Sequence, residues 1–285
     1  MTMTLQDPES TVRIEVLGEE LRRLRDVAGL TLTQVVERIG MHYSHLSRME
    51  NGKRPASPED VASLLVVYGI TGEERQEMLA LAKRAVQPGL WQRHGSFEAR
   101  FAALKMLESR ATTLIEFQPL LIPGLLQTVP YAQAIFREVG LFEDEEAIAE
   151  RVAGRIHRQA VLRKQHPARL VAIVAESALR HLVGGPAVMR EQLRYLTEVS
   201  DRPNVCLRVL PTAAGGHPGM DGPFIRMKFA DRPGVVFLPH RTSSLFLEES
   251  IEVSDYDRVI VELMSMAMTE ENSVRLVAEM AATLE

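Results

Sequence analysis

The sequence lacks the features of a secreted or membrane-embedded protein. Its 285 residues include one cysteine, Cys206, so no disulfide can form within the chain, which agrees with a reducing compartment. No apolar run reaches the roughly 18 to 20 residues that a membrane-spanning helix needs. The start of the chain, MTMTLQDPES, also lacks the basic-then-apolar order of a signal peptide. We therefore expect a cytoplasmic protein with no membrane partner.

Net positive charge is absent too. The 38 acidic residues outnumber the 33 Lys and Arg, which gives a formal net charge of -5. A protein held on nucleic acid by its overall charge would instead be strongly basic. Between residues 17 and 86 the acidic and basic residues balance. Any charge that faces DNA must therefore be local, which limits non-specific binding.

The short motifs of common enzyme classes are also missing. The sequence contains no G-x-S-x-G, no phosphate-binding P-loop and no G-x-G-x-x-G. His42 and His45 are three residues apart on an expected helix, but no further residue follows at metal-ligand spacing. The glycine-rich loop with His217 and Asp221 is open to two interpretations, a hydrolase or phosphate site and a long hairpin connection. We expect no catalysis, no metal and no cofactor, and an enzyme tethered to DNA is the alternative.

The most informative stretch runs from residue 31 to residue 52. Apolar residues at helical spacing predict two short helices, and Gly40 lies at the turn between them, where a positive φ favours glycine. Thr31 can cap the first helix, and Gln34 can complete a capping box. This layout predicts a helix-turn-helix, and an ordinary pair of antiparallel helices in a bundle is the alternative.

The second of these helices has a polar face that could enter a DNA groove. We expect Val36 and Leu46 to close the core between the two helices, which turns the polar side chains outward. Arg48 is the predicted principal base contact, because arginine can bond a guanine edge through two N–H groups. The predicted DNA-binding residues are Arg38, His42, Tyr43, Ser44, Ser47, Arg48, Asn51, Lys53 and Arg54.

This stretch resembles a known family. Glu37-Arg38-Ile39-Gly40, followed by Ser47-Arg48-Met49-Glu50-Asn51-Gly52-Lys53-Arg54, is similar to the motif of XRE-type regulators, the phage repressor and Cro-like proteins. The resemblance implies a sequence-specific DNA-binding domain. Two positions depart from it, Leu32, where the family often has Gln, and Val36, where it often has Ala. Leu32 cannot supply the amide contact that this Gln often makes at the DNA backbone.

The rest of the pattern divides the chain into segments. We predict a flexible tail over residues 1–16, a five-helix, mainly α helix-turn-helix domain over 17–86, a linker and connector helix over 87–117, and a C-terminal α+β domain over 118–285. Gln87-Pro88-Gly89 interrupts the helical pattern and marks the boundary. Short β-branched and aromatic runs predict a small sheet. The predicted strands cover residues 170–175, 205–210, 224–229, 235–238 and 245–247.

The second domain carries its own resemblance. An ordered series of short motifs is similar to the C-terminal domain of unknown function found in many actinomycete XRE-type regulators. The motifs are Pro123-Gly124-Leu125-Leu126-Gln127-Thr128, Tyr131-Ala132, Glu176, Ala178-Leu179-Arg180, Gln192-Leu193, Pro203-Asn204-Val205, Val209-Leu210-Pro211 and Gly222-Pro223-Phe224. Pro239 is a departure, because the family pattern usually has Glu there. The resemblance implies an antitoxin-like regulator, often encoded beside a small acidic partner protein.

The second domain is therefore expected to dimerise and to receive a signal. The segment from Leu120 to Leu126 could be an exposed recognition element, or it could thread the domain core. Glu176 could form a polar anchor with Arg151 or Arg155, or an ion pair internal to the domain. The candidate partner or ligand residues are Leu121, Pro123, Leu125, Arg155, Glu176, His217 and Asp221.

Together these features predict a transcriptional regulator that binds double-stranded operator DNA as a homodimer. Its DNA affinity is expected to respond to a small partner protein or a small-molecule effector at the second domain. The alternative is an antitoxin-like interaction module whose main activity is binding a small partner encoded by a neighbouring gene.

Overall fold

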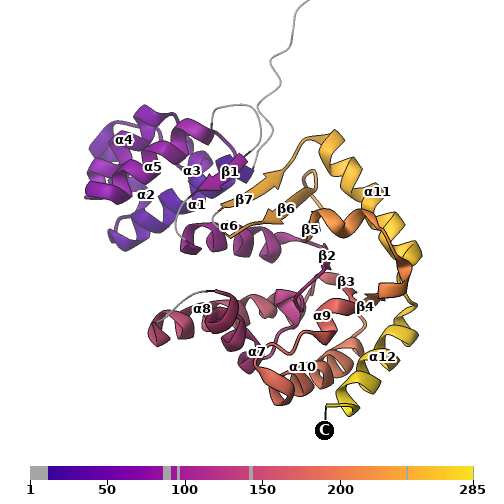
Figure 1. Ribbon diagram of the computed structural model, residues 1–285. Helices are drawn as coiled ribbons and strands as arrows, with labels where there is room; N and C mark the ends of the chain where they lie inside the picture. The colour runs from indigo at the N-terminus through magenta and orange to yellow at the C-terminus, as the bar shows by residue number, and fades with distance from the viewer. Residues whose placement is uncertain (1–11, 86–90, 95–96, 141–143, 242, 285) are drawn as a thin grey trace, which may run out of the picture. The chain divides into compact units, whose positions relative to one another are not determined.

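The computed structural model describes residues 12–85, 91–94, 97–140, 144–241 and 243–284, and the chain forms two compact units (Figure 1). The division falls between Ala103 and Leu104. The predicted boundary at Gln87-Pro88-Gly89 lies outside the described residues. Within the described ranges, no helix combines the length and the apolar character that a membrane crossing requires.

The described part of the first unit contains the five predicted helices. They are α1 (Val12–Val27), α2 (Leu32–Ile39), α3 (Tyr43–Glu50), α4 (Pro58–Val67) and α5 (Gly72–Ala85), and a short strand, β1 (Trp91–His94), follows. Side-chain caps mark where two of these helices begin. Thr31 and Gln34 form the predicted capping box at the start of α2, and Ser57 and Asp60 form a second one at α4.

The first helix begins earlier than predicted. The tail expected over residues 1–16 is wrong for its last five residues, because α1 starts at Val12, while residues 1–11 lie outside the described part of the chain. Val12, Ile14 and Val16 are buried. These apolar residues alternate with charged ones, so they do not continue the helical stripe that starts at Leu17.

The core between α2 and α3 also differs by one residue. Val35, not Val36, is fully buried together with Leu46, while Val36 is only partly buried. Both side chains are β-branched and adjacent in sequence, so spacing alone did not distinguish them. Because Val36 is only partly buried, a valine where the family often has alanine does not widen the packing at the centre of this core.

Helix α3 packs unusually closely on α1. A Cβ atom placed on Gly18 would lie 2.3 Å from the backbone oxygen of Met49, which leaves no room for any side chain at residue 18. Gly52, directly after α3, has a φ of 65°, and a Cβ there would lie 2.7 Å from the Cα of Glu15. Two glycines thus allow α3 and the turn after it to lie against the backbone of α1.

The second unit is built around a mixed sheet, which confirms the predicted α+β class. Its strands run in the order β7-β6-β5-β2-β3-β4, with β2, β3 and β4 parallel and the other neighbours antiparallel. The strands are β2 (Thr113–Gln118), β3 (Arg169–Ala175), β4 (Val205–Leu210), β5 (Phe224–Lys228), β6 (Val235–Pro239) and β7 (Ser243–Leu247). All five predicted strands are present, and β2 is additional.

Strand β2 corrects the predicted connector. The expected linker and connector helix covered residues 87–117, but α6 (Phe97–Arg110) ends at Arg110 and β2 follows at Thr113. This strand pairs with both β3 and β5, so it lies inside the sheet. Its central residue, Glu116, interrupts the apolar pattern by which buried strands are recognised, and the prediction therefore extended the helix.

Helices cover both faces of this sheet. The longer ones are α8 (Glu145–Arg158), α10 (Gly185–Ser200), α11 (Ser250–Met266) and α12 (Glu270–Ala282), and the shorter segments are η1 (Gly124–Leu126), α7 (Val129–Ala134), η2 (Ile135–Val139), η3 (Gln159–Leu162), α9 (Glu176–Arg180), η4 (Thr212–Ala214) and η5 (Pro218–Asp221). Figure 1 shows α7, α8 and α10 gathered together. Ile115 and Phe117 of β2 point into an apolar core that includes Leu263 of α11. Glu116 and Gln118 alternate onto the opposite face.

Candidate nucleic-acid interface

Helix α3 presents one apolar face and one polar face. Leu46 and Met49 are buried against the other helices of the first unit. Tyr43, Ser44 and Arg48 are exposed on the opposite face. Of the nine predicted DNA-binding residues, eight are exposed and Ser47 is half-buried. Eight of the nine therefore lie on α3 or close to its ends, and Arg38 lies in the last turn of α2. Contact of these residues with DNA stays a prediction.

The turn before α3 is formed as the sequence predicted. Gly40 has a φ of 68°, and its N–H donates to the oxygen of Val36 at 2.9 Å. His42, at the N-cap position of α3, makes no side-chain cap hydrogen bond. The first backbone N–H groups of α3 therefore have no side-chain acceptor from this residue, and such groups commonly bind phosphate.

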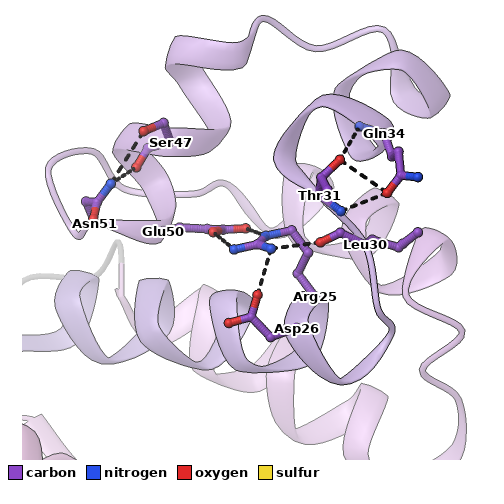
Figure 2. Close-up of polar contacts among 8 residues, drawn as sticks. All are labelled: Arg25, Asp26, Leu30, Thr31, Gln34, Ser47, Glu50 and Asn51. Atoms are coloured by element: carbon purple, nitrogen blue, oxygen red, sulfur yellow. Dashed lines mark hydrogen bonds and ion pairs between the residues drawn. The ribbon is translucent and has the colours of Figure 1, made fainter.

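The end of α3 is closed by a Schellman motif. The N–H of Lys53 donates to the oxygen of Arg48 at 2.8 Å, and the N–H of Gly52 donates to the oxygen of Met49 at 3.0 Å. The side-chain amide of Asn51 turns back and donates to the oxygen of Ser47 at 2.7 Å (Figure 2). Asn51 thus satisfies the helix end, and in this structure its amide donor faces α3 itself.

A buried ion pair that the sequence analysis missed holds α3 in place. Arg25 of α1 donates through Nε and Nη2 to the two carboxylate oxygens of Glu50, at 2.8 and 2.9 Å (Figure 2). Its Nη1 donates to the oxygen of Leu30 at 2.8 Å and to Asp26 at 2.7 Å. One guanidinium therefore ties the last residue of α3 to α1 and to the turn between α1 and α2.

The ion pair between Arg25 and Glu50 is shielded from solvent. Both side chains are buried, and the hydrogen bonds to Glu50 raise the pKa of Arg25 above its ordinary value. Burial and the negative charge of Glu50 together raise the pKa of the nearby Tyr68 hydroxyl. The only sequence signal for the pair was a charged residue, Arg25, directly beside the buried Leu24. Sequence spacing does not indicate that Arg25 pairs with Glu50, which lies 25 positions further along the chain.

The candidate segment in the second unit belongs mainly to the core. Leu125 is 1% exposed and Pro123 is buried, while Leu121 is partly buried and Leu120 is 57% exposed. The prediction that Pro123 and Leu125 are accessible to a partner is therefore wrong. Hydrogen bonds at Ile122 hold the segment inside this unit. Its N–H donates to the buried Tyr131 hydroxyl, and its oxygen accepts from the buried side-chain amide of Gln127.

The other candidate residues do not form one site. Glu176 forms an ion pair internal to the domain with Arg180 and accepts a hydrogen bond from the N–H of Thr212 at 2.9 Å. This is the second of the two alternatives, and among the described residues Glu176 forms no ion pair with Arg151 or Arg155. The bond from Thr212, with Arg180, lowers the pKa of Glu176. The ring of His217 lies edge-on to Phe117, with 5.8 Å between centroids, whereas Asp221 is exposed. Among the described residues, no group of three or more His, Cys, Asp and Glu could hold a metal ion.

Comparison with known families now places both units. Residues 101–279, more than half of the chain, match the model of a family described as a domain of unknown function, DUF5753. The chain belongs to this family. Residues 16–78 match the model of a helix-turn-helix domain, a match that covers most of α1, all of α2 to α4 and part of α5. No curated protein and no solved structure matches the DUF5753 chain.

Breaking the buried pair should destabilise the helix-turn-helix domain. Removing one member of a buried ion pair costs about 3–5 kcal/mol, because the remaining charge stays desolvated. We expect Glu50→Ala to show this loss in urea unfolding of the first unit. Glu74→Ala is the matched control, because it removes the partner of Arg23 from an exposed pair and should change stability by less than about 0.5 kcal/mol.

A double variant separates the charge effect from lost packing. Arg25→Met with Glu50→Leu removes both charges and should recover much of the stability that Glu50→Ala loses. Equal stability of the wild type and Glu50→Ala would show that the pair does not anchor α3.

Proposed function

We propose that this DUF5753 protein is a sequence-specific DNA-binding transcriptional regulator that reads its operator with α3. The helix-turn-helix match supports DNA binding in general terms. The observation that carries the more specific proposal is the exposed polar face of α3, which is held rigidly from behind by Arg25 and Glu50. A rigid, solvent-facing helix of this kind is what major-groove reading requires.

The charge on this face supports the proposal. Arg38, Arg48, Lys53 and Arg54 are all exposed, and none of the four is in an ion pair with another residue in the described part of the chain. The chain as a whole carries a net charge of -5. Four uncompensated positive charges on and beside the helix-turn-helix of an acidic protein favour phosphate binding at this part of the chain.

The working species in this proposal is a homodimer. One short helix reads only a few base pairs, and specific regulators exceed their non-specific binding by roughly 10³-fold or more. Two copies of α3 on a pseudo-palindrome supply that additional discrimination. The DUF5753 domain is the proposed site of dimerisation and of regulation by an effector or a small partner protein, and an interaction module whose main activity is partner binding is the alternative.

Replacing the central arginine of α3 should remove base discrimination. The operator is first obtained by sequencing the random DNA fragments that the pure protein enriches. Arg48→Ala should lose on the order of 1–3 kcal/mol of preference for this operator over scrambled DNA, with unchanged helical circular dichroism. Arg22→Ala, an exposed arginine of α1, is the control of equal charge and should keep the preference. Undiminished discrimination by Arg48→Ala would refute the assignment.

The oligomeric state gives a second measurement. Light scattering should show a dimer on the footprinted operator, with half-sites about 10 base pairs apart from centre to centre. A single protected half-site bound by a monomer would contradict the proposed dimer while leaving DNA binding intact.

A further inference from the structure

Three buried arginines of this protein use the same edge of the guanidinium group. In each of them, Nε and Nη2 donate in parallel to the two oxygens of one carboxylate. The pairs are Arg25 with Glu50 (2.8 and 2.9 Å), Arg158 with Glu108 (2.6 and 2.6 Å) and Arg226 with Asp257 (3.1 and 3.1 Å). This edge has the spacing of a carboxylate group, which makes the fork bidentate.

Arg155 of α8 differs from these three. Its Nη1 donates to the side-chain oxygen of Gln127 at 2.7 Å, and its Cζ lies 4.3 Å from the centre of the Phe136 ring. Its Nε is buried and has no hydrogen-bond acceptor among the described residues. No carboxylate in the described part of the chain forms an ion pair with it. The Nε–Nη2 edge of Arg155 is therefore without the anion that the other three arginines hold.

The surroundings hold Arg155 in a fixed orientation. Gln127 donates to the oxygen of Ile122 at 2.8 Å and accepts from Arg155, while Gln159 donates to the backbone oxygen of Gln127 at 2.6 Å. Tyr131 is fully buried and accepts from the N–H of Ile122 at 3.2 Å. Within the described ranges its own hydroxyl proton has no acceptor. Burial raises the pKa of this hydroxyl, while the N–H of Ile122 and the charge of Arg155 offset part of that rise. The Nε of Arg155 and the hydroxyl proton of Tyr131 are thus both without an acceptor among the described residues.

The charges around Arg155 leave an excess of one cation whenever Glu116 is protonated. Burial and the nearby Arg158 lower the pKa of Arg155 to about 10, so it stays charged at neutral pH. Arg158 is already neutralised by Glu108. The remaining carboxylate of this layer, Glu116, is buried, and burial raises its pKa to about 7. Close to pH 7 a large fraction of the molecules therefore lacks a counter-charge for Arg155, which favours a monoanion over a doubly charged phosphate.

We propose that Arg155 anchors a small organic carboxylate in the DUF5753 domain, with the Nε–Nη2 edge binding both oxygens and the Tyr131 hydroxyl as a further donor. The Arg155 side chain is only partly buried, so it can be reached from solvent. This inference gives the chemistry of the effector in the proposed regulator. Binding is measured without DNA, so its failure is distinct from a failure of the proposed DNA reading.

The proposal predicts a specific dependence on pH. A bound carboxylate adds negative charge beside Glu116, so it raises the pKa of Glu116 and binding takes up a proton. Carboxylate affinity should therefore be higher at pH 6 than at pH 8. The groups that face Glu116 are Glu108 of α6, Arg155 and Arg158 of α8, Gln118 of β2 and the N–H of Gly124. Burial raises the pKa of Glu116 itself to about 7, within this pH range.

The test is titration of the full-length protein with acetate and with benzoate at constant ionic strength. Binding is measured by calorimetry and by the shift of the thermal unfolding midpoint. Chloride and inorganic phosphate are the comparison anions. We expect at least one of the two carboxylates to bind more tightly than both comparison anions. Arg155→Gln should weaken that binding by at least tenfold, and Arg163→Gln, an exposed arginine that bonds Tyr195, should leave it unchanged.

Two further variants keep the result interpretable. Arg155→Lys retains the positive charge without the fork, so it should fold and still bind, at least tenfold more weakly, the carboxylate that the wild type binds. Glu116→Gln should bind with little difference between pH 6 and pH 8. The proposal is overturned if neither carboxylate binds better than chloride, which is the result expected when ordered water occupies the site, or if Arg155→Lys binds as well as the wild type.

Discussion

The buried contact between Arg25 and Glu50 is the constraint on which the DNA-facing geometry depends. Taking two charges out of water is expensive, and a pair of apolar side chains could hold α1 and α3 together with equal stability. An apolar pair would not, however, fix the rotation of α3 about its own axis. The planar fork of Arg25 accepts Glu50 in one orientation, and its third nitrogen is used by Leu30. The close approaches at Gly18 and Gly52 fix the distance between the two helices.

The second unit uses buried polar side chains in a different way. Gln127, Gln159 and Gln192 bond to backbone groups of the segment that follows β2, so these backbone groups are satisfied inside the fold. A long irregular segment in a core would otherwise carry a large desolvation cost. The same layer leaves Arg155 charged and oriented. Rigid support together with an unmet donor pair is the arrangement expected of a ligand site rather than of a structural ion pair.

Features set by neighbouring residues could be predicted from the sequence. The capping box of Thr31 and Gln34 and the positive φ of Gly40 depend on a few adjacent positions, and both are present. The outward face of α3 followed from its helical period. The strand β2 was missed because Glu116 interrupts its apolar pattern, and Arg25 was missed because a pairing across 25 positions leaves no periodic signal. The unpaired Nε–Nη2 edge of Arg155 could not be predicted, because it depends on three-dimensional contacts and nothing in the sequence distinguishes a buried arginine from a solvated one.

The central claim is that DNA binding rests on a local cluster of positive charge around α3, on a protein whose net charge is negative. The most direct measurement is the slope of log affinity against log salt concentration for the operator complex. Lys53→Ala and Arg54→Ala, measured separately, should each reduce the magnitude of this slope by about one while keeping the preference for operator over scrambled DNA. An unchanged slope in both variants would show that the phosphates are bound elsewhere on the protein and would contradict this account.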